Sequence, residues 1–168
     1  MSGTGAVAVF RGGAVEGEAV AEAYRGGVLL RAHFTRLPPG LHGFHVHRAG
    51  DLRGEGCAGA CDHLHMGRGG RHGPAPGAGG AARHSGDLGN VEEGRHYEYF
   101  LSDVRPCDLW GRALIVHADE DDLGHGDFPD SGTTGHSGAR IGCAIFGRLG
   151  DCQVSARQNT RRRSRRRL

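Results

Sequence analysis

Glycine occurs so often in this chain that long helices are not expected. Thirty-two of the 168 residues are glycine, and they are spread over most of the sequence. Glycine inside a helix costs roughly 0.5–1 kcal/mol relative to alanine and favours turns. We therefore expect no helix longer than ten residues, and a chain of short elements joined by turns.

Short runs between the glycines alternate apolar and polar residues, with the period of a β-strand. In "GVLLRAHFTRL" (27–37) the apolar residues share one face: Val28, Leu30, Ala32 and Phe34. Further strands are expected at 6–10, 41–47, 97–101, 112–117 and 139–147, and a weaker one at 14–24. Several short strands separated by turns predict an all-β antiparallel sandwich or barrel.

The charge of the chain is divided unevenly. Residues 157–168 hold seven arginines and no acid, whereas the rest holds 14 arginines and 19 acids. We expect one acidic domain over 1–152 and a disordered arginine-rich tail over 153–168. The tail is compatible with weak polyanion binding, with nuclear import or with a solubilising role. Without interleaved aromatic residues, it does not favour base-specific readout.

Membrane and export signals are not evident. No run approaches about 18 apolar residues, and the first residues show no basic segment followed by an apolar one. We therefore expect a cytoplasmic protein that does not bind membranes. The five cysteines are an odd number, and in a reducing compartment free thiols are the default.

The stretch "GLHGFHVH" (40–47) places three histidines in an apolar run. Because side chains alternate across a strand, His42 shares a face with Phe44 and Val46 and is expected in the core. His45 and His47 point together to the other face. That spacing suits two ligands of one metal, and it also suits a solvated face.

Two long segments, 48–90 and 118–139, interrupt the strand rhythm, and loops of this length are usually functional or disordered. The first contains several potential ligands, and His117 ends the strand before the second. Three histidines with one carboxylate suit Zn²⁺, whereas an all-imidazole set suits copper. Composition alone indicates two metals without dividing the ligands, which are His45, His47, His63, His72, His84, Asp87 and His117.

Five motifs together resemble the copper–zinc superoxide dismutase family, in order and at similar spacing. They are "GLHGFHVH" (40–47), "GD" (50–51), "RHSGDLGNV" (83–91), "GRALIVHADEDDLG" (111–124) and "GHSGARIGCAIFG" (135–147). The resemblance covers roughly residues 3–150. It implies an eight-stranded antiparallel Greek-key β-barrel, related to immunoglobulin-like sandwiches, with two long functional loops.

The resemblance also implies a role for each matching residue. Asp121 would accept hydrogen bonds from a copper and a zinc ligand, Arg140 would lie beside the copper, and Cys57 would form a disulfide with Cys143. His63 would bridge both metals and take part in catalysis with Arg140. The implied copper ligands are His45, His47, His63 and His117, and the implied zinc ligands are His63, His72, His84 and Asp87.

The implied activity is dismutation of superoxide to O₂ and H₂O₂ by a redox-cycling copper bridged to zinc. The implied partners are superoxide, a second copy of the chain and a copper chaperone. The alternative is an inactive homologue that keeps the fold and binds zinc, the chaperone, or both.

The chain departs from the family at several positions. In "CDHLHM" (61–66), two loop prolines are lost and His65 becomes a rival ligand for His63 or His72. Asp119 and Thr133 stand where the family has lysines that attract the substrate, so we expect a slower and less salt-dependent enzyme.

The expected dimer contact is also altered. Arg148 occupies a usually apolar position, Ala49 replaces a larger residue, and Trp110 lies at another contact position. A charge in an apolar interface is costly unless it is paired, so these residues weaken the prediction of a homodimer.

Overall fold

A computed structural model describes residues 5–67, 70–79 and 82–150. The expected tail over 153–168 lies outside the described residues. The elements are β1 (Ala6–Phe10), β2 (Glu16–Tyr24), β3 (Gly27–Arg36), β4 (His42–Val46), the 3₁₀ helix η1 (Glu55–Ala60), β5 (Asp87–Val91), β6 (His96–Leu101), α1 (Pro106–Leu109), β7 (Ala113–His117), α2 (Ser131–Thr134), β8 (Arg140–Ile145) and β9 (Gly147–Arg148).

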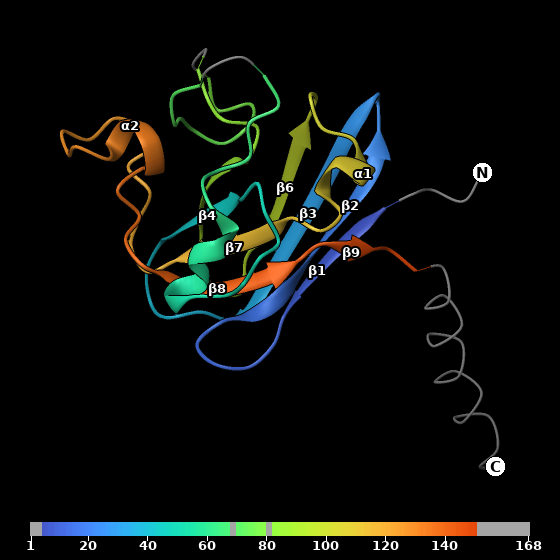
Figure 1. Ribbon diagram of the computed structural model, residues 1–168, viewed down its shortest axis with the longest axis horizontal. Helices are drawn as coiled ribbons and strands as arrows, with labels where there is room; N and C mark the ends of the chain where they lie inside the picture. Colours follow the sequence, from blue (N-terminus) through green and yellow to red (C-terminus); the bar gives the residue numbers. More distant parts are fainter. Residues whose placement is uncertain (1–4, 68–69, 80–81, 151–168) are drawn as a thin grey trace, which may run out of the picture.

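Two antiparallel sheets pack face to face. One has the strand order β6-β3-β2-β1-β9 and the other β5-β4-β7-β8 (Figure 1). The all-β prediction is confirmed, and so are the expected strands. No helix among the described residues exceeds six residues, and none of them is long and apolar enough to cross a membrane.

The two sheets form the sandwich arrangement of the expected fold and do not close into a barrel. The last predicted strand is divided at Phe146: β8 pairs with β7 in one sheet, and β9 pairs with β1 in the other. Phe146 itself is buried. A bend at this residue carries one strand from sheet to sheet and gives nine strands in place of eight.

The core lies between the sheets and follows the predicted alternation. In β3 the inward residues Val28, Leu30 and Phe34 are fully buried, whereas Arg31 on the other face is exposed. The ring of Phe34 meets the ring of Phe44 from the opposite sheet edge-to-face, with centroids 5.3 Å apart. This is a favourable aromatic geometry, and it joins the two layers.

The outer face of the four-stranded sheet is also covered. All five residues of β4 and all five of β7 are buried. The connections 48–86 and 118–139 leave the sheets beside these two strands (Figure 1). A disulfide between Cys57 and Cys143 ties η1, in the first connection, to β8.

Candidate metal centre

His42 belongs to the core, as its face predicted. It is buried, and its ring nitrogens lie 2.9 Å from the carbonyl oxygens of His117 and Pro38. Its neighbours His45 and His47 face the other way, and the covering loops bury them as well. The solvated-face alternative for this pair is therefore wrong.

Four histidines form a first group, in which one donor atom of each lies within 4.8 Å of the others. β4 supplies His45 and His47, and β7 supplies His117. His63 comes from the first long loop and is held next to His47 by a backbone bridge. The structure thus brings together every residue predicted for copper.

Each histidine of this first group uses one ring nitrogen for a hydrogen bond and leaves the other free. His47 Nδ1 donates to the Cys61 carbonyl at 2.7 Å, and His117 Nδ1 to the Gly138 carbonyl at 3.2 Å. His45 Nε2 donates to Asp121 at 2.7 Å. The buried nitrogens left without a partner are His45 Nδ1, His47 Nε2, His63 Nε2 and His117 Nε2.

Burial keeps these rings neutral. It lowers the pKa of His47 to about 2 and that of His117 to about 4. It also lowers the pKa of His63, and that of His45 well below its ordinary value. Unpartnered buried lone pairs are costly, and neutral imidazoles are good ligands. Four of them suit copper, so this first group fits a copper ion.

A second group joins His63, His72 and His84 around Asp87. Their Nδ1 atoms lie 2.8, 3.0 and 3.2 Å from one oxygen of Asp87. The other oxygen accepts the backbone N–H groups of Gly73 and His84. Three imidazoles and one carboxylate form a typical zinc set, so this second group fits zinc and contains every residue predicted for it.

The buried Asp87 carboxylate stays ionised in this position. Burial alone would raise its pKa, but the contacts with His63, His72 and His84 lower it below the ordinary range. His72 shows the reciprocal effect. Burial opposes its protonation, yet hydrogen bonds to Asp121 and Asp87 raise its pKa to about 9.

Asp121 connects the two groups. It is buried, and its two oxygens lie 2.7 Å from His45 Nε2 and 2.7 Å from His72 Nε2. A Cβ atom at Gly135 would lie 2.0 Å from the Asp121 carboxylate, so only glycine leaves room for this contact. The carboxylate orients one ring of each group.

Sequence reasoning gave no role to Asn90, although it lies in the quoted "GDLGN" motif. Its side chain accepts the Asp121 N–H at 2.7 Å and donates to the Asp121 carbonyl at 2.9 Å. Asn90 therefore fixes the backbone of the connecting aspartate. The motif showed that an amide was present, but the partner of an amide cannot be deduced from sequence.

Arg140 lies beside the first group, opposite His117 in the β7–β8 ladder. Its guanidinium donates to the carbonyls of Cys57 at 2.8 Å and of Cys61 at 2.7 Å. Guanidinium has five N–H donors, so others remain for a ligand. The Cys57–Cys143 disulfide holds the same turn against the strand that carries Arg140.

His65 lies outside both groups. Its ring centroid is 5.7 Å from that of His84, and neither of its ring nitrogens has a hydrogen-bond partner among the described residues. Asp119 and Thr133 are exposed on the second long loop. That loop (118–139) has six acidic residues and no arginine or lysine.

Comparison with known proteins identifies relatives that match most of the described chain. The family model for copper/zinc superoxide dismutase matches residues 14–146. A putative superoxide dismutase [Cu-Zn] of Orgyia pseudotsugata multicapsid polyhedrosis virus is 44% identical over 128 residues, covering 71% of this chain and 81% of that protein. The superoxide dismutase [Cu-Zn] of Paramecium bursaria Chlorella virus 1 is 44% identical over 66% of this chain and 60% of its own length.

Two further relatives carry different names. The copper chaperone for superoxide dismutase of Mus musculus is 40% identical over 71% of this chain and 43% of its own length. The crystal structure of the clock protein EA4 superposes with a TM-score of 0.76 and 34% identity, covering 89% of this chain and 97% of that one.

Proposed function

Because the chain belongs to the copper/zinc superoxide dismutase family, we propose that it catalyses the dismutation of superoxide. Two superoxide anions and two protons give one O₂ and one H₂O₂. The observation that carries the proposal is the first group, with its four buried imidazole nitrogens that lack a partner. Copper and zinc are the cofactors of this family, and the two groups suit them.

The proposed copper ligands are His45, His47, His63 and His117, and the proposed zinc ligands are His63, His72, His84 and Asp87. His63 is shared: its Nδ1 faces Asp87 and its Nε2 faces the other three histidines. Asp121 holds one ring on each side of it. Such outer hydrogen bonds fix ring orientation and increase ligand basicity.

Copper, when bound, would supply a one-electron redox couple for this reaction, and redox-inert zinc would keep its ligands in place. Arg140 binds the anionic substrate through its free N–H groups, and the two carbonyls that hold it set its direction. His63, when its Nε2 is not bound to a metal, would take up a proton there and give it to the forming peroxide, and the second proton would come from water. Its Nδ1 stays directed at the Asp87 side throughout.

The deciding experiment is metal analysis with a superoxide-dismutation assay on protein loaded with copper and zinc. We expect one copper, one zinc and activity. His45→Ala should lose copper and activity, whereas Arg140→Ala should keep both metals and lose most of the activity. Bound zinc without copper or activity would reject the enzyme and favour the alternative.

That alternative is an inactive homologue that binds zinc, a copper chaperone, or both. The altered stretch "CDHLHM" and the similarity to the mouse chaperone favour it. It predicts that changing Arg140 has no effect on any measured property except stability. The same variants therefore separate the two functions.

We also propose a homodimer, a copper chaperone as partner, and a cytoplasmic location. The Arg148 guanidinium lies 5.7 Å from the Trp110 ring centroid, which partly compensates its charge at the expected contact. A monomer in sedimentation at micromolar concentration would reject the dimer. Binding of the arginine-rich tail to polyanions is tested by heparin retention of the full chain against a chain that ends at residue 152.

A further inference from the structure

The outer face of the five-stranded sheet carries a row of three potential metal ligands, away from the metal centre. Glu18 of β2 is the direct neighbour of His33 in β3, and His33 is the direct neighbour of His96 in β6. Direct neighbours across antiparallel strands have Cβ atoms about 4.5–5.5 Å apart and project to the same side. The three side chains therefore stand in line across three strands.

The two imidazoles of this row are stacked. Their ring centroids are 4.2 Å apart and their planes differ by 10°. Zn²⁺ lies about 2.0–2.1 Å from a histidine nitrogen, so one ion can join nitrogens up to about 4.2 Å apart. The 4.2 Å here joins ring centres and not nitrogens, so the stacking shows that both rings reach the same place above the sheet, and a chelate requires them to turn toward one ion.

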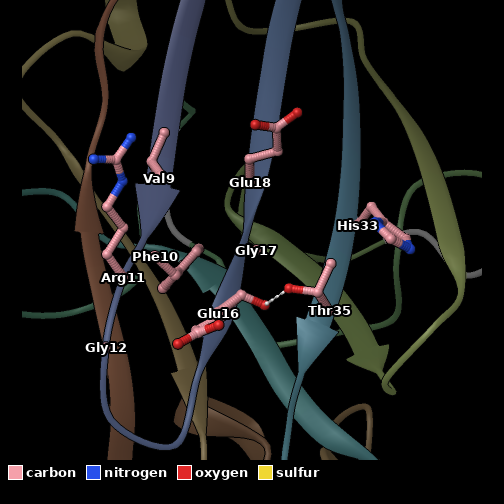
Figure 2. Close-up of a pocket in the computed structure, with 9 residues that line it drawn as sticks. All are labelled: Val9, Phe10, Arg11, Gly12, Glu16, Gly17, Glu18, His33 and Thr35. Atoms are coloured by element: carbon pink, nitrogen blue, oxygen red, sulfur yellow. Dashed lines mark hydrogen bonds between the residues drawn. The ribbon is translucent and has the colours of Figure 1, made fainter.

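The surroundings leave both rings accessible to a ligand. His33 and His96 line a hollow of about 650 Å³, together with Glu18 and Glu98. Glu18 and His33 also line the adjoining hollow over β1, β2 and β3 (Figure 2). Ligand access to the pair therefore needs no movement of the backbone.

Most charges around the row are already paired. Arg31 forms ion pairs with Glu22 and Glu98, and Arg36 with Glu16. In the part of the chain that the structure describes, Glu18 has no ion pair. Its carboxylate is thus available to a cation that the two imidazoles bind.

From this row we propose a third metal site, for a divalent transition ion such as Zn²⁺, Cu²⁺ or Ni²⁺, with His33 and His96 as ligands and Glu18 completing the set. Its donor atoms are not among the groups that lie within 4.8 Å of one another. The rings must therefore turn about their soft terminal torsions, and His96 is exposed and His33 half-buried beside the hollow, which leaves room for this rotation. The site joins β6, at the sheet edge, to β3 and β2, and it does not depend on dismutase activity.

The test is a calorimetric titration of untagged protein, already loaded with copper and zinc, with Ni²⁺. Ni²⁺ suits imidazole ligands and is distinguishable from the resident metals. We expect one additional equivalent in the unmodified chain. His33→Ala and His96→Ala should each weaken it at least about tenfold, the loss that removing even an outer hydrogen-bond partner of a ligand typically causes. Glu18→Gln should weaken it severalfold.

His125→Ala is the matched control, because His125 is another exposed histidine on a distant loop, and it should bind Ni²⁺ as the unmodified chain does. Far-UV circular dichroism of each variant checks that the sheet is intact. Absence of the additional equivalent, or its retention by both histidine variants, would overturn the site. Unchanged affinity in Glu18→Gln would overturn the part given to the carboxylate.

Discussion

The histidines of the metal centre are held in two different ways. His45, His47 and His117 stand on β4 and β7, and the backbone ladder between these strands fixes their positions. His72 and His84 lie on the first long loop, where their Nδ1 atoms meet one carboxylate oxygen of Asp87. The comparison teaches that the strands position most of the proposed copper ligands, whereas the proposed zinc ligands on the loop depend on one carboxylate.

The largest effect should come from changing one ligand on each side. His45→Ala removes a strand ligand, and we expect copper affinity to fall at least about a hundredfold, with loss of activity. His84→Ala should reduce zinc affinity by a similar factor and leave copper bound, because the strands still present His45, His47 and His117. Metal analysis after dialysis measures both.

Hydrogen exchange of the same two variants sharpens the comparison. His84→Ala should increase exchange in the first long loop and leave β4 and β7 protected. Equal loss of copper in both variants would show that the strand side is not independent of the loop.

Removal of the disulfide should have the next largest effect, on both stability and activity. Cys57→Ser with Cys143→Ser opens a link across 86 residues, and loss of a native disulfide typically costs 2–5 kcal/mol. The turn that holds Arg140 should loosen, so activity should fall further than copper content. Thermal unfolding and an activity assay measure the two effects.

Cys107→Ser is the control for the disulfide variant, since Cys107 is exposed and free. It should unfold at the same temperature as the unmodified chain. A double variant with unchanged activity per bound copper would disprove the link between the disulfide and the arginine.

Asp121→Asn tests the connection between the two sides. An amide keeps one acceptor but turns an N–H₂ donor toward the N–H of either His45 or His72. We expect a loss of about 10–100-fold in the affinity for one metal, as for other outer partners. Asn90→Ala should cause a smaller loss in the same direction, because Asp121 keeps its own contacts. Competition with a chelator of known affinity measures both variants.

The smallest effect concerns charge. The second long loop carries six acids, two histidines and no arginine or lysine, so it does not attract an anionic substrate. Asp119→Lys with Thr133→Lys should raise kcat/KM severalfold at low salt, and the gain should shrink as salt screens it. The unmodified chain should show little dependence on ionic strength. A steep fall of its rate with salt would contradict this expectation.

The fold was largely predictable because alternation marks a strand wherever one face is buried. The alternation predicts the buried face of β3, and it also places His42 on the opposite face of its strand from His45 and His47. It does not reveal β5: Gly86 and Gly89 interrupt the pattern, which therefore predicts a loop over residues 87–90. The division of the last strand at Phe146 is also not predictable from the sequence, because the alternation of apolar and polar residues continues unchanged where a strand passes from one sheet to the other.

The candidate site was predictable in part. Strand geometry paired His45 with His47, but the partition of the other ligands came from resemblance to a family. No pattern in the sequence tells which ring nitrogen is free. That follows from distant partners such as the Cys61 carbonyl and Asp121, which only the folded chain brings together.

The disulfide also has a topological consequence. Cys57 and Cys143 close a covalent ring, and apart from His45 and His47 every proposed metal ligand lies within it, together with Asp121 and Arg140. A single proteolytic nick anywhere in that ring, including the long glycine-rich connection, leaves both fragments attached. The nicked chain would migrate as one species without reductant and as two with it, so these proposed ligands and Arg140 stay attached to one another after the backbone is cut.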